Sequence, residues 1–166
     1  MIILGLPRSR TAWLSVFMSQ SNTHFHHEAI NGCNSMDEYK EKVKGCGDST
    51  TALPFLKGEL AGCKVVVIRK DKKELQRCID WTNSEFGGDN EQAILDLDLE
   101  LSLIDGLTIN QSDIDNRLKE IWAHLVDDHW HDKYLEISKM NIQVQNTAID
   151  SDAAKNLIKG VSLWLG

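Results

Sequence analysis

The chain has 166 residues, of which 42% are hydrophobic and 26% charged, values that are ordinary for a soluble globular protein. The formal net charge of −7 argues against a general nucleic-acid or membrane-surface binder, because phosphate-rich surfaces attract basic faces. A local basic site stays open. The length suits one domain over residues 1–166.

The first two predicted elements are a strand and a helix separated by a polar turn. Residues 2–6 (IILGL) form an apolar run too short for a helix, which predicts a fully buried strand. Trp13, Val16 and Phe17 recur at helical spacing. This spacing predicts a helix over residues 11–20 that packs on the sheet.

The middle of the chain alternates between strands and helices. A short strand is predicted at 23–28 (THFHHE), and a capping box begins a helix over about 35–44. Residues 64–69 (KVVVIR) show no polar alternation, which is typical of a strand buried on both faces of a parallel sheet. A capped helix over about 71–82 follows.

The last third is mostly helical. The segment 95–103 (LDLDLELSL) fits either a half-buried strand or a helix, and the helix is favoured because a good helix start precedes it. An edge strand is predicted at 107–110, and Asp113 is expected to cap the next helix. A shorter helix is predicted over about 130–139, and an amphipathic helix over about 151–165.

Strands that alternate with helices predict an α/β protein with three layers, a parallel sheet between helices. We expect the core to span 1–145 and the helix at about 151–165 to dock on it. Ligands of such folds bind beyond the carboxyl ends of the strands. The turn after the first strand lies at that edge.

The cysteines and the start of the chain indicate a reducing compartment. No two cysteines form a CxxC pair, and no segment approaches the ~20 apolar residues of a membrane span. The chain enters a strand without a signal-like segment. We therefore expect a cytoplasmic protein with free thiols at four positions: Cys33, Cys46, Cys63 and Cys78.

Residues 5–13 (GLPRSRTAW) carry two arginines and two hydroxyls between a strand and a helix. Helix N-termini bind anions, and arginine recognises tetrahedral oxyanions with a planar fork. The Gly-Lys pair of a nucleotide-binding P-loop is absent, and Arg69 ends the second apolar strand where a metal-binding carboxylate would stand. The turn thus predicts an anion site that needs no metal.

This stretch resembles the 5′-phosphosulfate loop of the sulfotransferases, and its spelling is similar to that of small sulfotransferase-like proteins of bacteria and their phages. The matching residues are Pro7, Arg8, Ser9, Thr11 and Trp13. Four more segments resemble the family: FHHE (25–28), the Gly-Asp-Ser turn in CGDS (46–49), KVVVIRKDKKELQRC (64–78) and WHDKYLEISKMNIQV (130–144).

The resemblance implies a P-loop NTPase-like fold and sulfuryl transfer from 3′-phosphoadenosine 5′-phosphosulfate to a small-molecule hydroxyl or amine. Arg8 would hold the bridging and sulfuryl oxygens, and Arg69 the 3′-phosphate. Arg77 replaces the family's serine, and Arg10 its glycine. Backbone N–H groups would come from four residues, of which Thr11 also offers a hydroxyl: Ser9, Arg10, Thr11 and Ala12.

A base must take the acceptor's proton, and histidine is the usual choice near neutral pH. His27 and Glu28 match the family's His-Glu pair, and His27 is favoured, with Asp48 as a third option. In a strand, His24, His26 and Glu28 would share one face, so a metal site there is an alternative. Residues 127–132 (DDHWHD) offer another.

Three functions remain open. A sulfotransferase-like enzyme is favoured, with a non-enzymatic, degenerate P-loop binding protein second and a P-loop kinase of a nucleotide or other small molecule third. The absence of the Gly-Lys pair counts against the kinase. The substitutions at Arg10 and Arg77 favour the binding protein. A homodimer through the C-terminal helix stays open.

Overall fold

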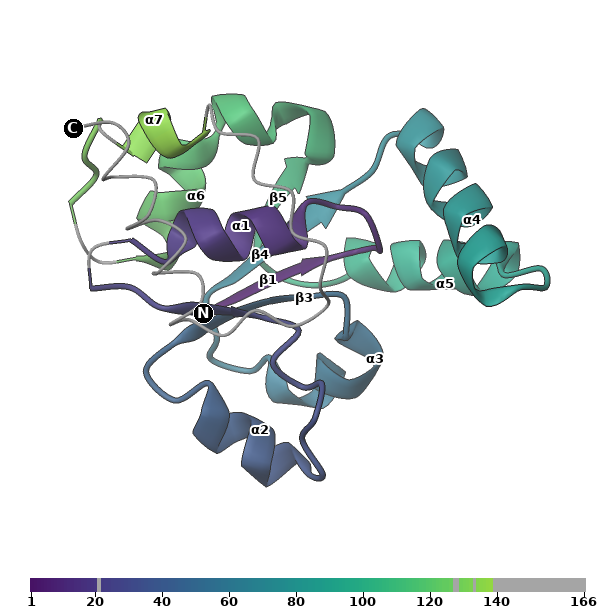
Figure 1. The fold of residues 1–166 in the computed structure, drawn as a ribbon, viewed down its shortest axis with the longest axis horizontal. Coiled ribbons are helices and arrows are strands. Elements are labelled where there is room, and N and C mark those ends of the chain that lie inside the picture. The colour runs from purple at the N-terminus through teal and green to yellow at the C-terminus, as the bar shows by residue number, and fades with distance from the viewer. Residues whose placement is uncertain (21, 127–128, 133, 139–166) are drawn as a thin grey trace.

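The computed structural model describes residues 1–20, 22–126, 129–132 and 134–138. Five parallel strands form one sheet in the order β2-β3-β1-β4-β5 (Figure 1). The strands are β1 (Ile2–Gly5), β2 (Phe25–His27), β3 (Gly47–Thr50), β4 (Val65–Arg69) and β5 (Leu107–Asn110). From the central β1, the chain first builds β2 and β3 on one side and then β4 and β5 on the other.

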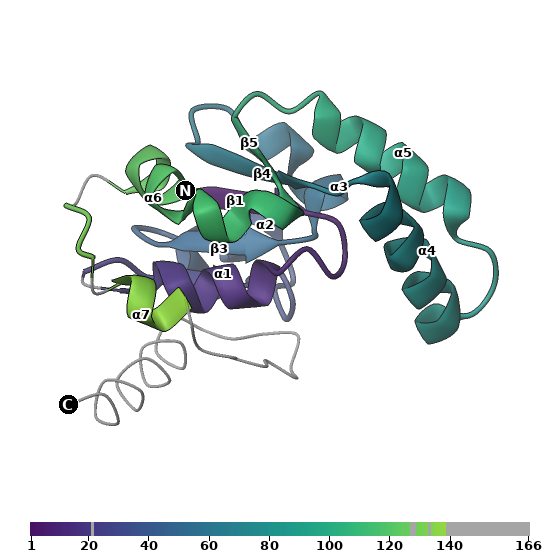
Figure 2. The ribbon, with the colours of Figure 1, turned by 90° about the horizontal axis from the view of Figure 1, so that it is seen from above.

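Helices cover both faces of the sheet, which confirms the predicted α/β class. Figure 2 shows α4 and α5 projecting together on the side where the strands end. The α-helices are α1 (Thr11–Met18), α2 (Met36–Lys42), α3 (Leu53–Leu56), α4 (Lys72–Phe86), α5 (Glu91–Ser102), α6 (Leu118–Leu125) and α7 (Tyr134–Ser138). Two 3₁₀ helices are η1 (Lys57–Glu59) and η2 (Gln111–Asn116).

Strand alternation divides the core into two sides. Ile3 and Ile68 pack with α1 and α6 on one face, while Leu4 and Val67 pack with α3, α4 and α5 on the other. All four side chains are fully buried. The uninterrupted apolar runs of β1 and β4 therefore have the predicted cause, since both faces of these strands are covered.

Three predicted elements differ from the structure. Residues 46–49 were expected to form a turn, but β3 pairs there between β1 and β2, and Gly47 is needed because the Phe25 ring covers it. Asp113 lies within η2 and caps no α-helix, since Arg117 N–H bonds back to the Asp113 and Ile114 carbonyls. Within the described part of the helix expected at about 130–139, residues 130–132 are not helical and Tyr134–Ser138 form α7.

Several other expectations are confirmed. Residues 95–103 lie almost wholly in helix α5, and 107–110 form β5. The helix expected at 71–82 continues to Phe86. The amphipathic segment at about 151–165 lies outside the described residues. In the described part of the chain, no helix has the length and apolar character needed to cross a membrane.

Candidate functional site

A tight turn joins β1 to α1. Ser9 N–H donates to the Leu6 carbonyl at 3.1 Å, which closes the four-residue turn Leu6–Ser9 with Pro7 second and Arg8 third. Arg8 has a φ of 65°, a value that the third position of such a turn usually leaves to glycine. Arg10 follows with a φ of 63° as the N-cap of α1. Two arginines thus hold left-handed backbone, at roughly 1–2 kcal/mol each.

The start of α1 presents free backbone donors. Its first helical hydrogen bond runs from Leu14 N–H to the Arg10 carbonyl at 2.8 Å. The N–H groups of Thr11, Ala12 and Trp13 therefore have no acceptor within the helix. Thr11 and Ala12 are two of the residues expected to supply N–H groups to an anion.

The backbone N–H expected of Ser9 is not free to bind a ligand. Its N–H is already bound to Leu6, and its buried hydroxyl has no hydrogen-bond partner and lies against Gly5. A Cβ at Gly5 would lie 2.8 Å from Ser9 Cβ, so glycine is required there. Ser9 therefore packs the turn onto the sheet, and its N–H is used within the turn.

Arg10 directs its guanidinium away from the turn. Its Nη2 lies 2.8 Å from Asp115 Oδ1 on η2, and its guanidinium carbon lies 4.3 Å from the centroid of the Trp13 ring. Trp13 itself is buried and stacks on Phe17. The Arg10 side chain and the Trp13 ring are therefore structural in this conformation, and only the backbone at Arg10 follows the family's glycine.

A basic pocket of about 300 Å³ opens between the turn and α4. Its lining includes three cations, one carboxylate and an aromatic ring: Arg8, Lys70, Arg77, Glu74 and Trp81, with Cys78 and Gln111. The Arg8 guanidinium carbon lies 5.7 Å from the Trp81 ring centroid. Arg77 pairs with Glu74 one helical turn away. By count, the pocket has a net charge of +2.

Sequence analysis missed Lys70, the buried cation of this pocket. Its side chain is 8% exposed, and Nζ donates to the Arg8 carbonyl at 3.1 Å and to Gln111 Oε1 at 2.6 Å. Burial lowers the pKa of this ammonium. The sequence does carry a signal for Lys70, because a cation that directly follows an apolar strand lies at the ligand-binding edge of the sheet.

Arg69, which was expected to hold a 3′-phosphate, faces α5 instead. Its Nε and Nη2 donate to the two carboxylate oxygens of Asp98 at 3.1 and 2.8 Å. Such a bidentate pair satisfies the fork of the guanidinium. Arg69 does not line the basic pocket, whereas Arg77 does.

His27 lies at the carboxyl end of β2 with a fixed ring orientation. Its Nδ1 lies 2.8 Å from the Ser49 carbonyl oxygen, which can only accept a hydrogen bond. In the neutral ring, Nδ1 therefore carries the proton and Nε2 keeps its lone pair. His27 is 8% exposed. The ring has the tautomer that a general base needs.

Glu28 does not continue β2 as expected, because its φ is 53° and the strand ends at His27. It therefore does not share a strand face with His24 and His26. Its carboxylate accepts from the Thr50 hydroxyl at 2.6 Å and from Thr51 N–H at 2.7 Å. These bonds tie the end of β2 to the end of β3, which is a positioning role.

Asp48 is fully buried within β3 and points to the face opposite His27. Its carboxylate accepts from Tyr39 OH and Ala29 N–H, each at 3.2 Å. Burial, and secondarily the charge of Glu28, raises its pKa to about 6. Asp48 is therefore a structural carboxyl rather than a base open to a substrate.

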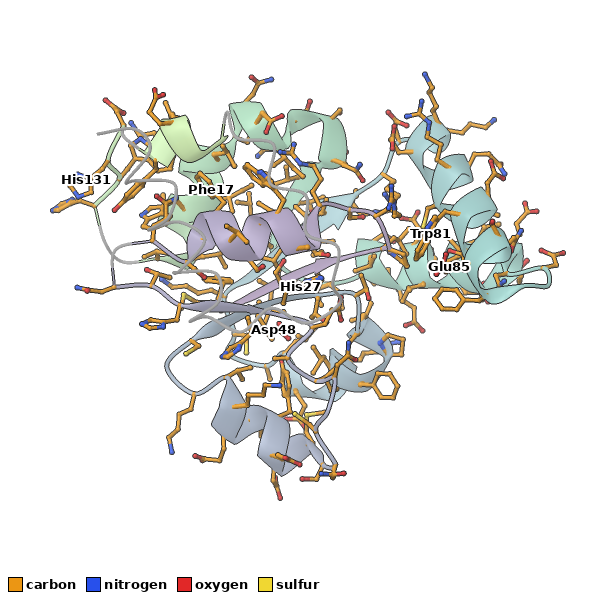
Figure 3. The ribbon with its side chains drawn as sticks, in the orientation of Figure 1. Phe17, His27, Asp48, Trp81, Glu85 and His131 are labelled. Atoms are coloured by element: carbon orange, nitrogen blue, oxygen red, sulfur yellow. The ribbon has the colours of Figure 1, made fainter. Side chains whose placement is uncertain are left out.

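Two groups of polar residues thus lie at the strand ends. The basic pocket lies beside α4, where Figure 3 labels Trp81, and His27 lies in the sheet beyond β1. Neither His27 nor Glu28 lines that pocket. The basic pocket thus provides cations that could bind an anion, while His27 provides a possible base at the end of β2.

The sequence offered two candidate metal motifs and predicted four free thiols. Among the residues that the structure describes, no three histidine, cysteine, aspartate or glutamate side chains are placed to hold a metal ion. Residues 127–128 of the second candidate metal motif lie outside the described ranges. No disulfide joins the four cysteines.

Comparison of the chain with known protein families, with curated proteins and with solved structures finds no significant match.

Proposed function

We propose that the chain is a sulfotransferase-like enzyme that takes 3′-phosphoadenosine 5′-phosphosulfate as donor and a small molecule as acceptor. One observation carries the proposal: Arg8, in the turn that leads into the free N–H groups of α1, lines a pocket with a net charge of +2. We also propose that the sheet is of the P-loop type, with the central β1 leading through an anion-binding turn into α1.

The residues suggest a division of roles. Arg8 and the N–H groups of Thr11 and Ala12 would hold the 5′-phosphosulfate, where a helix N-terminus favours negative charge. Lys70 and Arg77 would hold the 3′-phosphate in place of Arg69, which Asp98 occupies. The donor supplies the sulfuryl group and a bisphosphate leaving group.

The acceptor's proton would go to His27 Nε2. As the acceptor oxygen or nitrogen bonds to sulfur, the bond between sulfur and the bridging oxygen breaks, and the electron pair stays with the phosphate. Arg8 offsets the charge that develops on that phosphate. Glu28 keeps the ends of β2 and β3 together and so positions His27.

A binding protein without transferase activity is the second candidate. The observation that favours it is the position of His27 and Glu28, which do not line the basic pocket. A binding protein would need only the turn and the pocket. It would bind the nucleotide as tightly as an enzyme would but would transfer nothing.

The testing experiment is a thermal-shift panel followed by a transfer assay. Adenosine 3′,5′-bisphosphate at ~100 times its Kd should add about 2.7 kcal/mol of stability. For a domain of this size the melting temperature should rise by roughly 5–10 °C. ATP with Mg²⁺ should give a much smaller rise. The absence of any rise with the bisphosphate would overturn the proposal, and a rise without sulfuryl transfer to any acceptor would favour the binding protein.

A further inference from the structure

Lys70 has an unusual environment for a lysine. Among the described residues it is the most deeply buried lysine or arginine, at 8% exposed. Its two hydrogen-bond acceptors, the Arg8 carbonyl and Gln111 Oε1, are both neutral. An ammonium taken out of water is costly unless a negative charge compensates it. The protein offers hydrogen bonds here but no paired carboxylate.

The charges around the pocket increase this imbalance. Arg8 and Arg77 line the same pocket as Lys70, and the one carboxylate of the lining, Glu74, is paired with Arg77. Asp71 follows Lys70 directly, but its carboxylate caps α4 by accepting Glu74 N–H at 2.8 Å. Neither carboxylate pairs directly with the Lys70 ammonium, so an anionic ligand in the pocket would supply the direct ion pair that the protein does not.

The geometry of the ammonium indicates where that ligand lies. An ammonium has three N–H bonds, and two of them point to Arg8 and Gln111. Because Lys70 also lines the pocket, its third N–H is available to a ligand there. Gln111 belongs to η2, so an element distant in sequence fixes the direction of that N–H.

We propose that Lys70 is a specificity-determining residue that binds a phosphate monoester dianion in the basic pocket, and that Gln111 is the positioning residue that directs it. This inference rests on the proposed function for the identity of the donor, but not for the chemistry of the pocket. A dianion can accept from both cations that the proposed function leaves for it, Lys70 and Arg77, whereas a phosphodiester or sulfate ester carries only one negative charge. The Trp81 ring beside Arg8 adds an apolar wall for the group that bears the phosphate.

The test measures binding by calorimetry to the full chain with three probes: adenosine 3′,5′-bisphosphate, adenosine 5′-phosphosulfate and inorganic phosphate. Lys70→Met should lower the affinity for the bisphosphate about 10- to 100-fold, since the substitution removes a charged hydrogen bond. The affinity for adenosine 5′-phosphosulfate, which has no phosphate monoester, should fall less than threefold. Lys73→Met is the matched control, because Lys73 is exposed on α4 and lies outside the pocket lining, and it should leave all three affinities unchanged.

Gln111→Glu separates a role in specificity from a role in folding. The carboxylate keeps an acceptor for Lys70 and adds a charge-assisted bond, so the melting temperature should hold or rise. It also lowers the pocket's net charge from +2 to +1, so the affinity for the bisphosphate should fall about tenfold or more. An unchanged affinity in Gln111→Glu, or in a folded Lys70→Met, would overturn the inference.

The probes also separate this inference from the proposed function. If inorganic phosphate binds and Lys70→Met abolishes its binding while the bisphosphate fails to bind, the inference stands and the proposed function falls. If the bisphosphate binds and responds to Arg8→Ala but not to Lys70→Met, the inference falls and the proposed function stands. If no probe binds the wild-type chain, both fall.

Discussion

His27 Nδ1 and the Ser49 carbonyl oxygen lie 2.8 Å apart across the β2–β3 ladder. Because a carbonyl can only accept, this contact places the proton of a neutral imidazole on Nδ1. The lone pair of Nε2 is then available to a substrate proton. Glu28, by contrast, has both carboxylate oxygens occupied.

The first prediction follows from this tautomer. His27→Asn keeps a donor near the position of Nδ1 for the Ser49 carbonyl and removes Nε2. Turnover should fall about 10²- to 10⁴-fold, the usual contribution of a general base, while the Kd of the donor stays within about twofold. Steady-state kinetics and calorimetry measure the two effects. Normal turnover in His27→Asn would show that the base lies elsewhere.

The second prediction compares the two arginines of the turn. Arg8→Ala should weaken binding of adenosine 3′,5′-bisphosphate about 10- to 100-fold, because a hydrogen bond to a charged group contributes about 1.5–3 kcal/mol. Arg10→Ala should weaken it less than threefold, since the Arg10 guanidinium binds Asp115 and lies on Trp13. Equal losses in the two variants, measured by calorimetry, would contradict this assignment.

The third prediction concerns metal ions. Cations rather than carboxylates surround the turn, so the bisphosphate should bind with the same Kd in EDTA as in excess Mg²⁺. Calorimetry in the two buffers at equal ionic strength makes the comparison. A loss of affinity in EDTA would revive the kinase interpretation, because phosphoryl transfer uses Mg²⁺ to bridge phosphate oxygens.

The fourth prediction is a pH dependence of stability that arises from Asp48. Its pKa is raised from 3.8 to about 6, so the folded protein binds more protons than the unfolded chain between these values. The free energy of unfolding therefore falls as pH rises through this window and levels off above it. At about 1.4 kcal/mol per pKa unit, the change amounts to roughly 3 kcal/mol.

Asp48→Asn isolates this contribution. The amide oxygen can still accept from Ala29 N–H, and the variant carries no charge to bury. The stability of Asp48→Asn relative to wild type should increase from pH 4 to pH 7.5, as measured by urea unfolding. A difference that does not depend on pH would show that Asp48 titrates normally in the folded protein.

The sequence was sufficient for most of the fold because long-range burial leaves a local signal. β4 is apolar without alternation because helices cover both of its faces, and α4 begins where Asp71 accepts Glu74 N–H. β3 (Gly47–Thr50) was missed because it is short and polar. Its place is set by pairing with β1 and β2, and such pairing is not visible in a local window.

The sequence predicted the backbone of the site but not the directions of its side chains. The turn and the start of α1 follow from the residues at 5–13, but the directions of the cationic side chains depend on distant partners. Arg10 turns to Asp115 and Arg69 to Asp98, each far along the chain. Lys70 donates to Gln111, which lies 41 residues further along the chain. No spacing rule links these pairs.

The fifth prediction separates Arg69 from the pocket cations. Its two hydrogen bonds to Asp98 hold α5 against the end of β4, and the Asp98 side chain is only 16% exposed. Arg69→Ala leaves a half-buried carboxylate without its partner, so the free energy of unfolding should fall by roughly 1–3 kcal/mol. The double variant Arg69→Ala/Asp98→Ala should lose less than the sum of the two single variants, because the pair acts as a unit.

Arg69→Ala should affect ligand binding much less than it affects stability. The affinity of Arg69→Ala for adenosine 3′,5′-bisphosphate should stay within about threefold of wild type, because the guanidinium faces α5 and does not line the pocket. Urea unfolding and calorimetry on the same preparations give the two quantities. A tenfold loss of affinity with unchanged stability would mean that Arg69 leaves Asp98 when the ligand binds. The 3′-phosphate would then belong to Arg69, as the family resemblance implies, rather than to Lys70 and Arg77.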